Sequence, residues 1–188
     1  MRPSALLCLA ALCSSSACAQ NNALFFTFPN GNVFDGSNPV VLELWTQFEP
    51  QYLAFAGWAG GVNSSDPTGK WQNYVQLSIC GTAGCAKASG GSLTGMIIGQ
   101  LHFPPAGIFA KTDNPIRLFS VEWTSQDLTK RKVDLATITT KYSLYLNSGM
   151  SINITPEQAD GRIHVVPAPG ALIAGPCLLV VAYRRARR

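Results

Sequence analysis

The chain has 188 residues, a length that suits one domain, and its formal charge of +4 comes from arginines at its two ends. Between Gln20 and Val166 there are nine Lys or Arg and ten Asp or Glu, so this region has a net charge of −1. A nearly neutral body has no basic surface for nucleic acid, and we expect no nucleic-acid partner.

The first 19 residues have the pattern of a secretory signal peptide. Arg2 provides the positive start, "ALLCLAAL" (5–12) is an apolar run, and Ala17-Cys18-Ala19 fits a small-x-small cleavage site. We therefore predict cleavage between Ala19 and Gln20 and export of the mature chain. A buried N-terminal helix and a lipoprotein acylated at Cys18 are the alternatives.

Residues 20–164 predict an all-β domain. Short apolar and aromatic runs are separated by turn signals such as "DGSNP", "NSSDPTG" and "PPAG", a pattern typical of a sandwich or barrel rather than of βαβ units. We predict an antiparallel, jelly-roll-like β-sandwich that is large enough to bury a core without metals or several disulfides. The predicted strands cover residues 23–28, 39–48, 52–60, 71–80, 91–101, 116–126, 136–146, 149–156 and 161–166.

Three segments allow finer predictions. Strict alternation over 136–146 places Ile138 and Tyr142 on one buried face. The apolar side changes partway along 116–126, which predicts a bulge or burial on both faces. The segment "TPEQAD" (155–160) begins with a Thr cap and a Pro at the first helical position, and it is predicted as a helical turn or a simple turn.

The body contains two of the six cysteines, Cys80 and Cys85, and the other four lie in the signal peptide or the C-terminal tail. Outside the cytoplasm, two thiols this close are expected to form a disulfide. Closing so short a loop contributes about 2 kcal/mol to stability. A zinc site would need two more ligands, and there is no second CxxC and no HxxxH. We predict no metal and no cofactor.

Candidate catalytic residues are few. The two histidines are His102 and His164, and no G-x-S-x-G motif accompanies them, so His102 is expected to be structural. Glu43 and Glu122 each stand in a predicted strand and could form the carboxylate pair of a glycoside hydrolase. Alternating strands also place charged residues outward without any catalytic role. We therefore predict no catalytic residue and keep the hydrolase as an alternative.

Two loops raise the question of calcium. Asp35 and Asp66 lie in turn-rich segments whose carboxylates and carbonyls are of the kind that calcium prefers. Asx turns explain both segments without a metal, and the sequence leaves the choice open.

The tryptophans offer an alternative function. Solvent-facing indoles could stack against sugars, as in carbohydrate-binding modules, but most large aromatic residues of a sandwich pack between its sheets. The body also contains the sequons "NSS" (63–65) and "NIT" (153–155). The four tryptophans are Trp45, Trp58, Trp71 and Trp123.

Residues 165–188 differ in composition from the body. The apolar segment 170–183 is shorter than the roughly 20 residues of a stable membrane span, and Pro176 would kink it as a helix. Basic residues stay on the cytoplasmic side, so a short hydrophobic helix could hold the chain in the membrane transiently. A permanent C-terminal anchor is the alternative. The basic cluster is Arg184, Arg185, Arg187 and Arg188.

This tail resembles the PEP-CTERM sorting signal of exported bacterial proteins. The matching parts are Val166-Pro167-Ala168-Pro169, the apolar segment and the terminal arginines, with Ala168 where that family usually has Glu. The resemblance implies recognition by an exosortase, a membrane protease, with cleavage near the prolines and delivery to the cell surface or extracellular matrix. The segment "GQLHFPPAGIFA" (99–110) also resembles secreted planctomycete-type proteins with such tails.

These observations predict a signal peptide (1–19), a β-sandwich (20–164) and a sorting tail (165–188). The expected function is that of an exported, non-enzymatic surface or matrix protein. Its expected partners are an exosortase, the membrane before processing and extracellular polysaccharide. A carbohydrate-binding module with exposed tryptophans is the alternative, followed by a secreted glycoside hydrolase.

Overall fold

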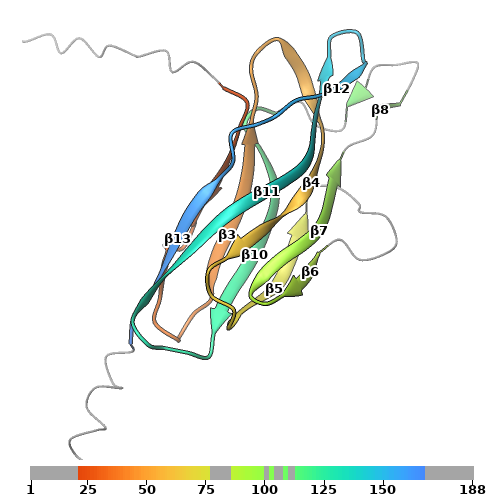
Figure 1. Ribbon diagram of the computed structural model, residues 1–188. Helices are drawn as coiled ribbons and strands as arrows, with labels where there is room; N and C mark the ends of the chain where they lie inside the picture. Colours follow the sequence, from red (N-terminus) through yellow and green to blue (C-terminus); the bar gives the residue numbers. More distant parts are fainter. Residues whose placement is uncertain (1–20, 77–85, 100–101, 104–107, 110–112, 168–188) are drawn as a thin grey trace, which may run out of the picture.

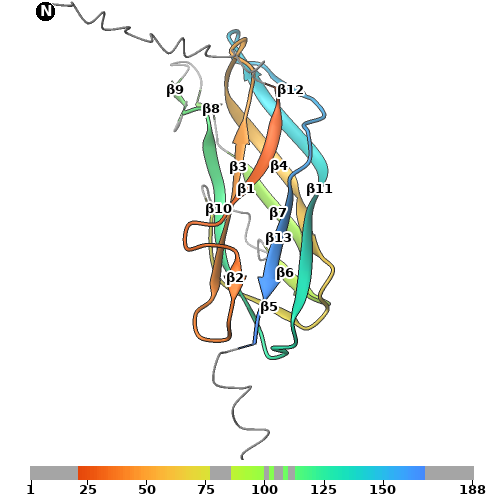
Figure 2. The same ribbon diagram turned by 90° about the vertical axis from the view of Figure 1, so that its left-hand side faces the viewer.

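The structure is a computed structural model that describes residues 21–76, 86–99, 102–103, 108–109 and 113–167. This part of the chain consists of strands, turns and bends, and it contains no helix that could cross a membrane. The expected β-sandwich is confirmed: two sheets pack face to face, and Figure 2 shows β3 and β10 in one layer and β4 and β11 in the other.

We call the two layers the small sheet and the large sheet (Figure 1). The small sheet is antiparallel, in the order β1 (Ala23–Thr27), β3 (Val40–Gln47), β10 (Ile116–Ser125), β5 (Gly69–Gln76). The large sheet has the order β2 (Val33–Phe34), β13 (Asp160–Val165), β11 (Arg131–Leu146), β4 (Tyr52–Ser64), β7 (Ser92–Gly99), β6 (Lys87–Ser89), and β12 (Ser151–Asn153) also pairs with β11. A separate hairpin joins β8 (His102–Phe103) to β9 (Ile108–Phe109).

One strand pair departs from the expected antiparallel arrangement. β2 and β13 run parallel, with Val33 opposite His164 and Phe34 opposite Val165. The first part of the chain therefore contributes to both sheets, because β1 belongs to the small sheet and β2 to the large one.

The helical turn considered for 155–160 is not formed. The backbone N–H of Glu157 donates to the carbonyl of Asn22 at 2.8 Å, and the Glu157 carbonyl accepts from the N–H of Leu24 at 2.9 Å. An isolated helical turn fixes several dihedral angles for a single hydrogen bond, whereas this extended segment makes two bonds to the start of β1.

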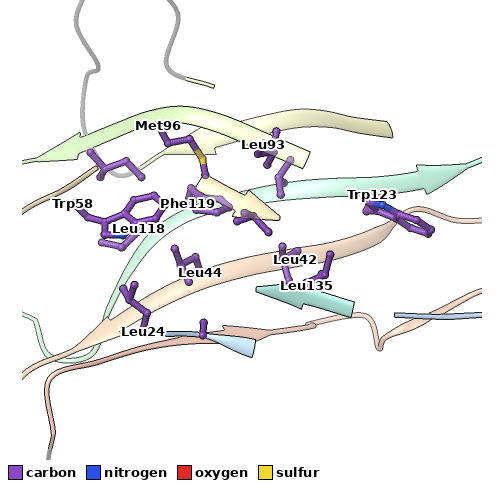
Figure 3. Packing of buried hydrophobic residues seen from close by; sticks show 14 of the residues in the cluster. Leu24, Leu42, Leu44, Trp58, Leu93, Met96, Leu118, Phe119, Trp123 and Leu135 are labelled. Carbon is purple, nitrogen blue, oxygen red and sulfur yellow. The ribbon is translucent and has the colours of Figure 1, made fainter. Parts of the chain in front are cut away.

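The core fills the space between the inner faces of the two sheets. Figure 3 shows Leu42 and Leu44 of the small sheet opposite Trp58 and Met96 of the large sheet, all nearly inaccessible to solvent. Burying an aliphatic side chain of this size contributes about 1.5–3 kcal/mol. The strict alternation of buried and partly exposed residues along β3 follows from its central place in the small sheet.

The predicted irregularity of 116–126 is confirmed. The register of β10 against β3 shifts between Arg117 and Phe119, so Leu118 and Phe119 are both buried although they are neighbours in sequence. This bulge explains why the apolar positions of β10 change side partway along the strand.

The strict alternation predicted for 136–146 is wrong. The register of β11 against β4 shifts between Thr139 and Lys141. This irregularity turns Ile138 to the outer face of the large sheet, where 47% of it is exposed, while Tyr142 is buried. A slip of one residue moves a side chain to the opposite face of a sheet.

Candidate binding faces of the sandwich

Several predicted sites lie outside the described residues and stay predictions. They are the signal cleavage between Ala19 and Gln20, the disulfide of Cys80 and Cys85, the sorting-motif residues Ala168 and Pro169, and the basic cluster of Arg184, Arg185, Arg187 and Arg188.

The predicted sorting motif follows the last strand of the sandwich. β13 finishes at Val165, and the N–H of Val166 still donates to the carbonyl of Phe34 at 2.9 Å. Pro167 is the last described residue, and it has no N–H with which to continue the pairing. β13 therefore includes Val165, the first residue of the predicted tail, and the division between domain and tail stays a prediction.

The two candidate catalytic carboxylates lie on the outer face of the small sheet. Glu43 accepts hydrogen bonds from Arg117 at 2.7 Å, from Trp45 at 3.1 Å and from Thr27 at 3.2 Å. Burial opposes ionisation of Glu43, but these bonds outweigh it and lower the pKa of its carboxyl below the ordinary value. A general acid needs a raised pKa, so Glu43 is poorly suited to protonate a glycosidic oxygen.

The two histidines are placed in different sheets. His102 belongs to β8 of the short hairpin and His164 to β13 of the large sheet. In the register of the large sheet, His164 lies between Lys132 of β11 and Val33 of β2.

Both loops considered for calcium contain an Asx turn. Asp35 accepts from the N–H of Ser37 at 2.9 Å, and Asp66 accepts from the N–H of Thr68 at 2.8 Å. The carboxylate of Asp66 is further bound by Arg131, whose positive charge occupies the place that a cation would take. The described residues contain no group of three His, Cys, Asp or Glu placed to hold a metal ion.

A shallow groove crosses the outer face of the large sheet. Its floor is β4, where the backbone of "AGWAG" presents small residues outward while Trp58 turns into the core. Its volume is about 230 Å³, and β7, β11 and β12 supply its other walls. The lining residues are Ala56, Gly57, Trp58, Ala59, Ile97, Ile98, Gly99, Lys141, Ser143, Tyr145 and Ser151.

The groove is bordered by exposed apolar side chains and one cation. Ile97 lies on β7 opposite Ala59 of β4, and 63% of it is exposed. Lys141 lies on β11 opposite the same alanine. Ile138 continues the apolar border along β11. We call the groove together with Ile97, Ile138 and Lys141 the large-sheet face.

The large-sheet face was not predicted from the sequence, because it is formed mainly by small and aliphatic residues, which are not typical of catalytic or metal sites. The available signal was the run of small residues in "AFAGWAGG" within an otherwise apolar strand. The groove itself depends on which strands flank β4, and that pairing is long-range.

The structure separates the four tryptophans. Trp58 and Trp123 are buried, and Trp71 packs against the core and donates to the carbonyl of Gly91 at 2.6 Å. Trp45 alone lies on an outer face, that of the small sheet, between Phe25 of β1 and Arg117 of β10 in the register. The expectation of core packing holds for three of the four.

The fold is similar to that of cohesin modules. The chain matches a cohesin module from a Clostridium perfringens family 33 glycoside hydrolase with a TM-score of 0.52 and 7% identity, over 79% of this chain and 98% of that one. It matches a chain of a type I cohesin–dockerin complex containing OlpA from Clostridium thermocellum with a TM-score of 0.53 and 11% identity, over 77% and 100% of the two chains. The seventh ScaB type I cohesin from Pseudobacteroides cellulosolvens gives a TM-score of 0.53 and 12% identity, over 77% of this chain and 93% of that one.

No protein-family model and no curated sequence that we compared with the chain matches it. The likeness therefore identifies the fold: the described residues form a cohesin-like β-sandwich.

Proposed function

We propose that the chain is an exported, non-enzymatic module that binds a protein partner through the large-sheet face. The main observation that supports this proposal is the shallow groove on β4, which is bordered by Ile97, Ile138 and Lys141. A floor of small residues lets a partner's backbone approach the sheet closely, and exposed apolar borders supply contact area. A cohesin of similar fold has been solved in complex with a dockerin, which supports protein binding as the kind of function.

The chemistry of the large-sheet face defines the partner. Small apolar side chains of the partner fit over Gly57 and Ala59, where larger ones would be excluded by Ile97 and Tyr145. Lys141 selects for a carboxylate beside these apolar groups, because a charge of opposite sign at the rim steers and orients association. We therefore expect a small-residue surface with an adjacent acidic group.

Photo-crosslinking tests this proposal. A photoreactive side chain at position 97 in the full chain, expressed in its host, is expected to capture one defined protein. Val75 provides the matched control, because it is 59% exposed against 63% for Ile97 and lies on the small sheet. Ile97→Asp should abolish capture from a second reactive position at Ile138, and Val75→Asp should leave it intact. Equal capture from positions 97 and 75, or none from position 97, would overturn the proposal.

We also propose that the tail sorts the module to the cell surface or matrix. In support, Val166 and Pro167, the first two residues of the predicted motif, directly follow the end of β13 in the sequence. Intact mass spectrometry of the native protein tests this. A mature form from Gln20 to a residue between Val166 and Gly170 supports sorting, and a form that retains Arg188 contradicts cleavage.

A further inference from the structure

The second outer face of the sandwich carries a different set of side chains. Trp45 of β3 lies on the small sheet with its indole Nε1 fixed by two acceptors, Thr27 Oγ1 at 3.0 Å and Glu43 Oε2 at 3.1 Å. Glu43 is in turn held by the ion pair with Arg117 at 2.7 Å. The indole orientation is thus set before any ligand arrives, which reduces the ordering cost of binding.

A carboxylate–carboxamide cluster lies on the same face. Glu122 of β10 accepts hydrogen bonds from Asn73 at 2.7 Å and from Gln72 at 3.2 Å, both reaching Oε2. A carboxylate offers about four acceptor positions, so the cluster retains capacity for hydroxyl donors. The two carboxamides add both donor and acceptor groups.

The backbone of β5 is shaped to build this cluster. Asn73 has a φ of 53°, the only positive φ at a non-glycine residue among the described part of the chain. The β5 register shifts at the same place, so that Asn73 and Tyr74 together oppose Val121 of β10. Asn73 and Gln72 consequently both turn outward to Glu122, whereas Tyr74 packs on the core. Bulges and left-handed residues of this kind gather at binding sites because they re-aim side chains.

The two groups form one row. Arg117 pairs with Trp45 in the register, and Glu122 pairs with Val41. Trp45 and Val41 lie four residues apart along β3 and point to the same side, so the row is about 13 Å long. This length and flat shape suit an extended chain of two or three sugar rings rather than a single small molecule.

We propose that this row, Trp45–Glu43–Arg117–Glu122–Asn73–Gln72, binds a neutral polysaccharide. A sugar ring presents an apolar C–H face to the indole of Trp45 and hydroxyls to the surrounding carboxylates and carboxamides. The single cation of the row is already paired with Glu43, so the row has a net charge of −1 and disfavours acidic polysaccharides. This site lies on the opposite face from the proposed protein-binding groove and does not depend on it.

Affinity electrophoresis of the full chain in gels containing xyloglucan, mixed-linkage β-glucan, galactomannan or alginate tests the proposal. At least one neutral polysaccharide is expected to retard the wild-type protein, and alginate is not. Trp45→Ala should weaken the retarding interaction at least tenfold, and Asn73→Ala or Glu122→Gln should weaken it three- to tenfold. The polysaccharide that retards the protein should also reduce the quenching of tryptophan fluorescence by acrylamide in the wild type. This reduction should be absent in Trp45→Phe.

Ile97→Asp on the opposite face serves as the control and should bind polysaccharide as the wild type does. Because Asn73 and Glu122 are surface residues, their variants keep the test decisive if Trp45→Ala fails to fold. Retardation by none of the neutral polysaccharides, retardation by alginate alone, or equal retardation of wild type and all three row variants would overturn the proposal. Specific protein crosslinks from position 75 that are lost in Trp45→Ala would assign this face to a protein partner instead.

Discussion

Arg131 places its Nη2 atom 2.6 Å from Oδ2 of Asp66, and this ion pair joins the turn between β4 and β5 to the start of β11. Only 5% of the Asp66 side chain and 21% of the Arg131 side chain are exposed. The same Nη2 donates to Ser125 at 2.8 Å, at the end of β10 in the small sheet. One guanidinium therefore ties both layers together at one end of the sandwich.

Asp66→Asn should lower the free energy of unfolding by about 2–3 kcal/mol, because it removes the buried counter-charge of Arg131 and leaves only the more exposed Asp127, at 3.3 Å. Asp134→Asn is the matched control. Asp134 also bonds an arginine, Arg162, at 2.6 Å, but its side chain is 60% exposed. Its loss should cost under about 0.5 kcal/mol. Urea unfolding of the full chain measures both, and equal losses would contradict a structural role for the Asp66–Arg131 pair.

Acidification should destabilise the protein in the pH range in which the carboxylate of Asp66 becomes protonated. Burial opposes ionisation of Asp66, but the hydrogen bonds from Thr68 and Arg131 outweigh it and hold the pKa below its ordinary value of 3.8. The unfolded chain then binds the proton more readily, so this contribution is complete above about pH 4 and is lost as the pH falls through the folded-state pKa. Thermal melts between pH 7 and pH 2.5 should show a steeper fall below pH 4 in the wild type than in Asp66→Asn. Parallel curves would contradict the assignment.

A buried hydrogen bond joins the two sheets at the other end. The Tyr142 hydroxyl lies 2.6 Å from Oγ1 of Thr46, and burial raises the pKa of Tyr142 to about 12. Tyr142→Phe should cost about 1–2 kcal/mol in urea unfolding. Tyr74→Phe is the control, because the Tyr74 hydroxyl is buried without a hydrogen-bond partner among the described residues. That variant should stay within about 0.5 kcal/mol of the wild type, and a larger loss there than in Tyr142→Phe would refute the comparison.

Two neighbouring glycines of the turn between β6 and β7 should respond differently to alanine. Both have positive φ, 54° at Gly90 and 80° at Gly91. Nothing lies within 4 Å of a Cβ at Gly90, whereas a Cβ at Gly91 would overlap the carbonyl oxygen of Asp66. Gly90→Ala should cost about 1 kcal/mol from the backbone conformation alone. Gly91→Ala should cost about 3 kcal/mol or more in the same unfolding assay, and similar losses would contradict this packing.

Much of the sandwich was predictable from local signals. The segment 39–48 is a run of mainly apolar residues that follows a turn signal, and β3 occupies Val40–Gln47 within it. The apolar residues change from one face to the other within 116–126, and this change correctly predicted the bulge in β10. These features are readable because burial on one face of a strand imposes a period of two on its own sequence.

The features that could not be predicted from the sequence depend on pairing between strands that are far apart in the chain. β2 and β6 have two and three residues, too few for a pattern, and they are strands because β13 and β7 pair with them. The bulge near Thr139 in β11 arises from the pairing of β11 with β4. Because of it, Ile138 lies on the outer face of the large sheet instead of the predicted inner face. The two proposed binding faces could not be predicted for the same reason, since the row around Trp45 joins residues of three strands through their register. The disulfide of Cys80 and Cys85 stays a prediction.

The parallel contacts near the two ends of the domain have a mechanical consequence. Near the start of the domain the N–H of Leu24 donates to the carbonyl of Glu157, and near its end the N–H of Val166 donates to the carbonyl of Phe34. A pull that separates the two ends thus draws β2 and β13 in opposite directions along their length. Their hydrogen bonds are strained together in shear, instead of opening one after another as in a hairpin peeled from its end. A module of this topology is therefore expected to resist tension applied between its two ends.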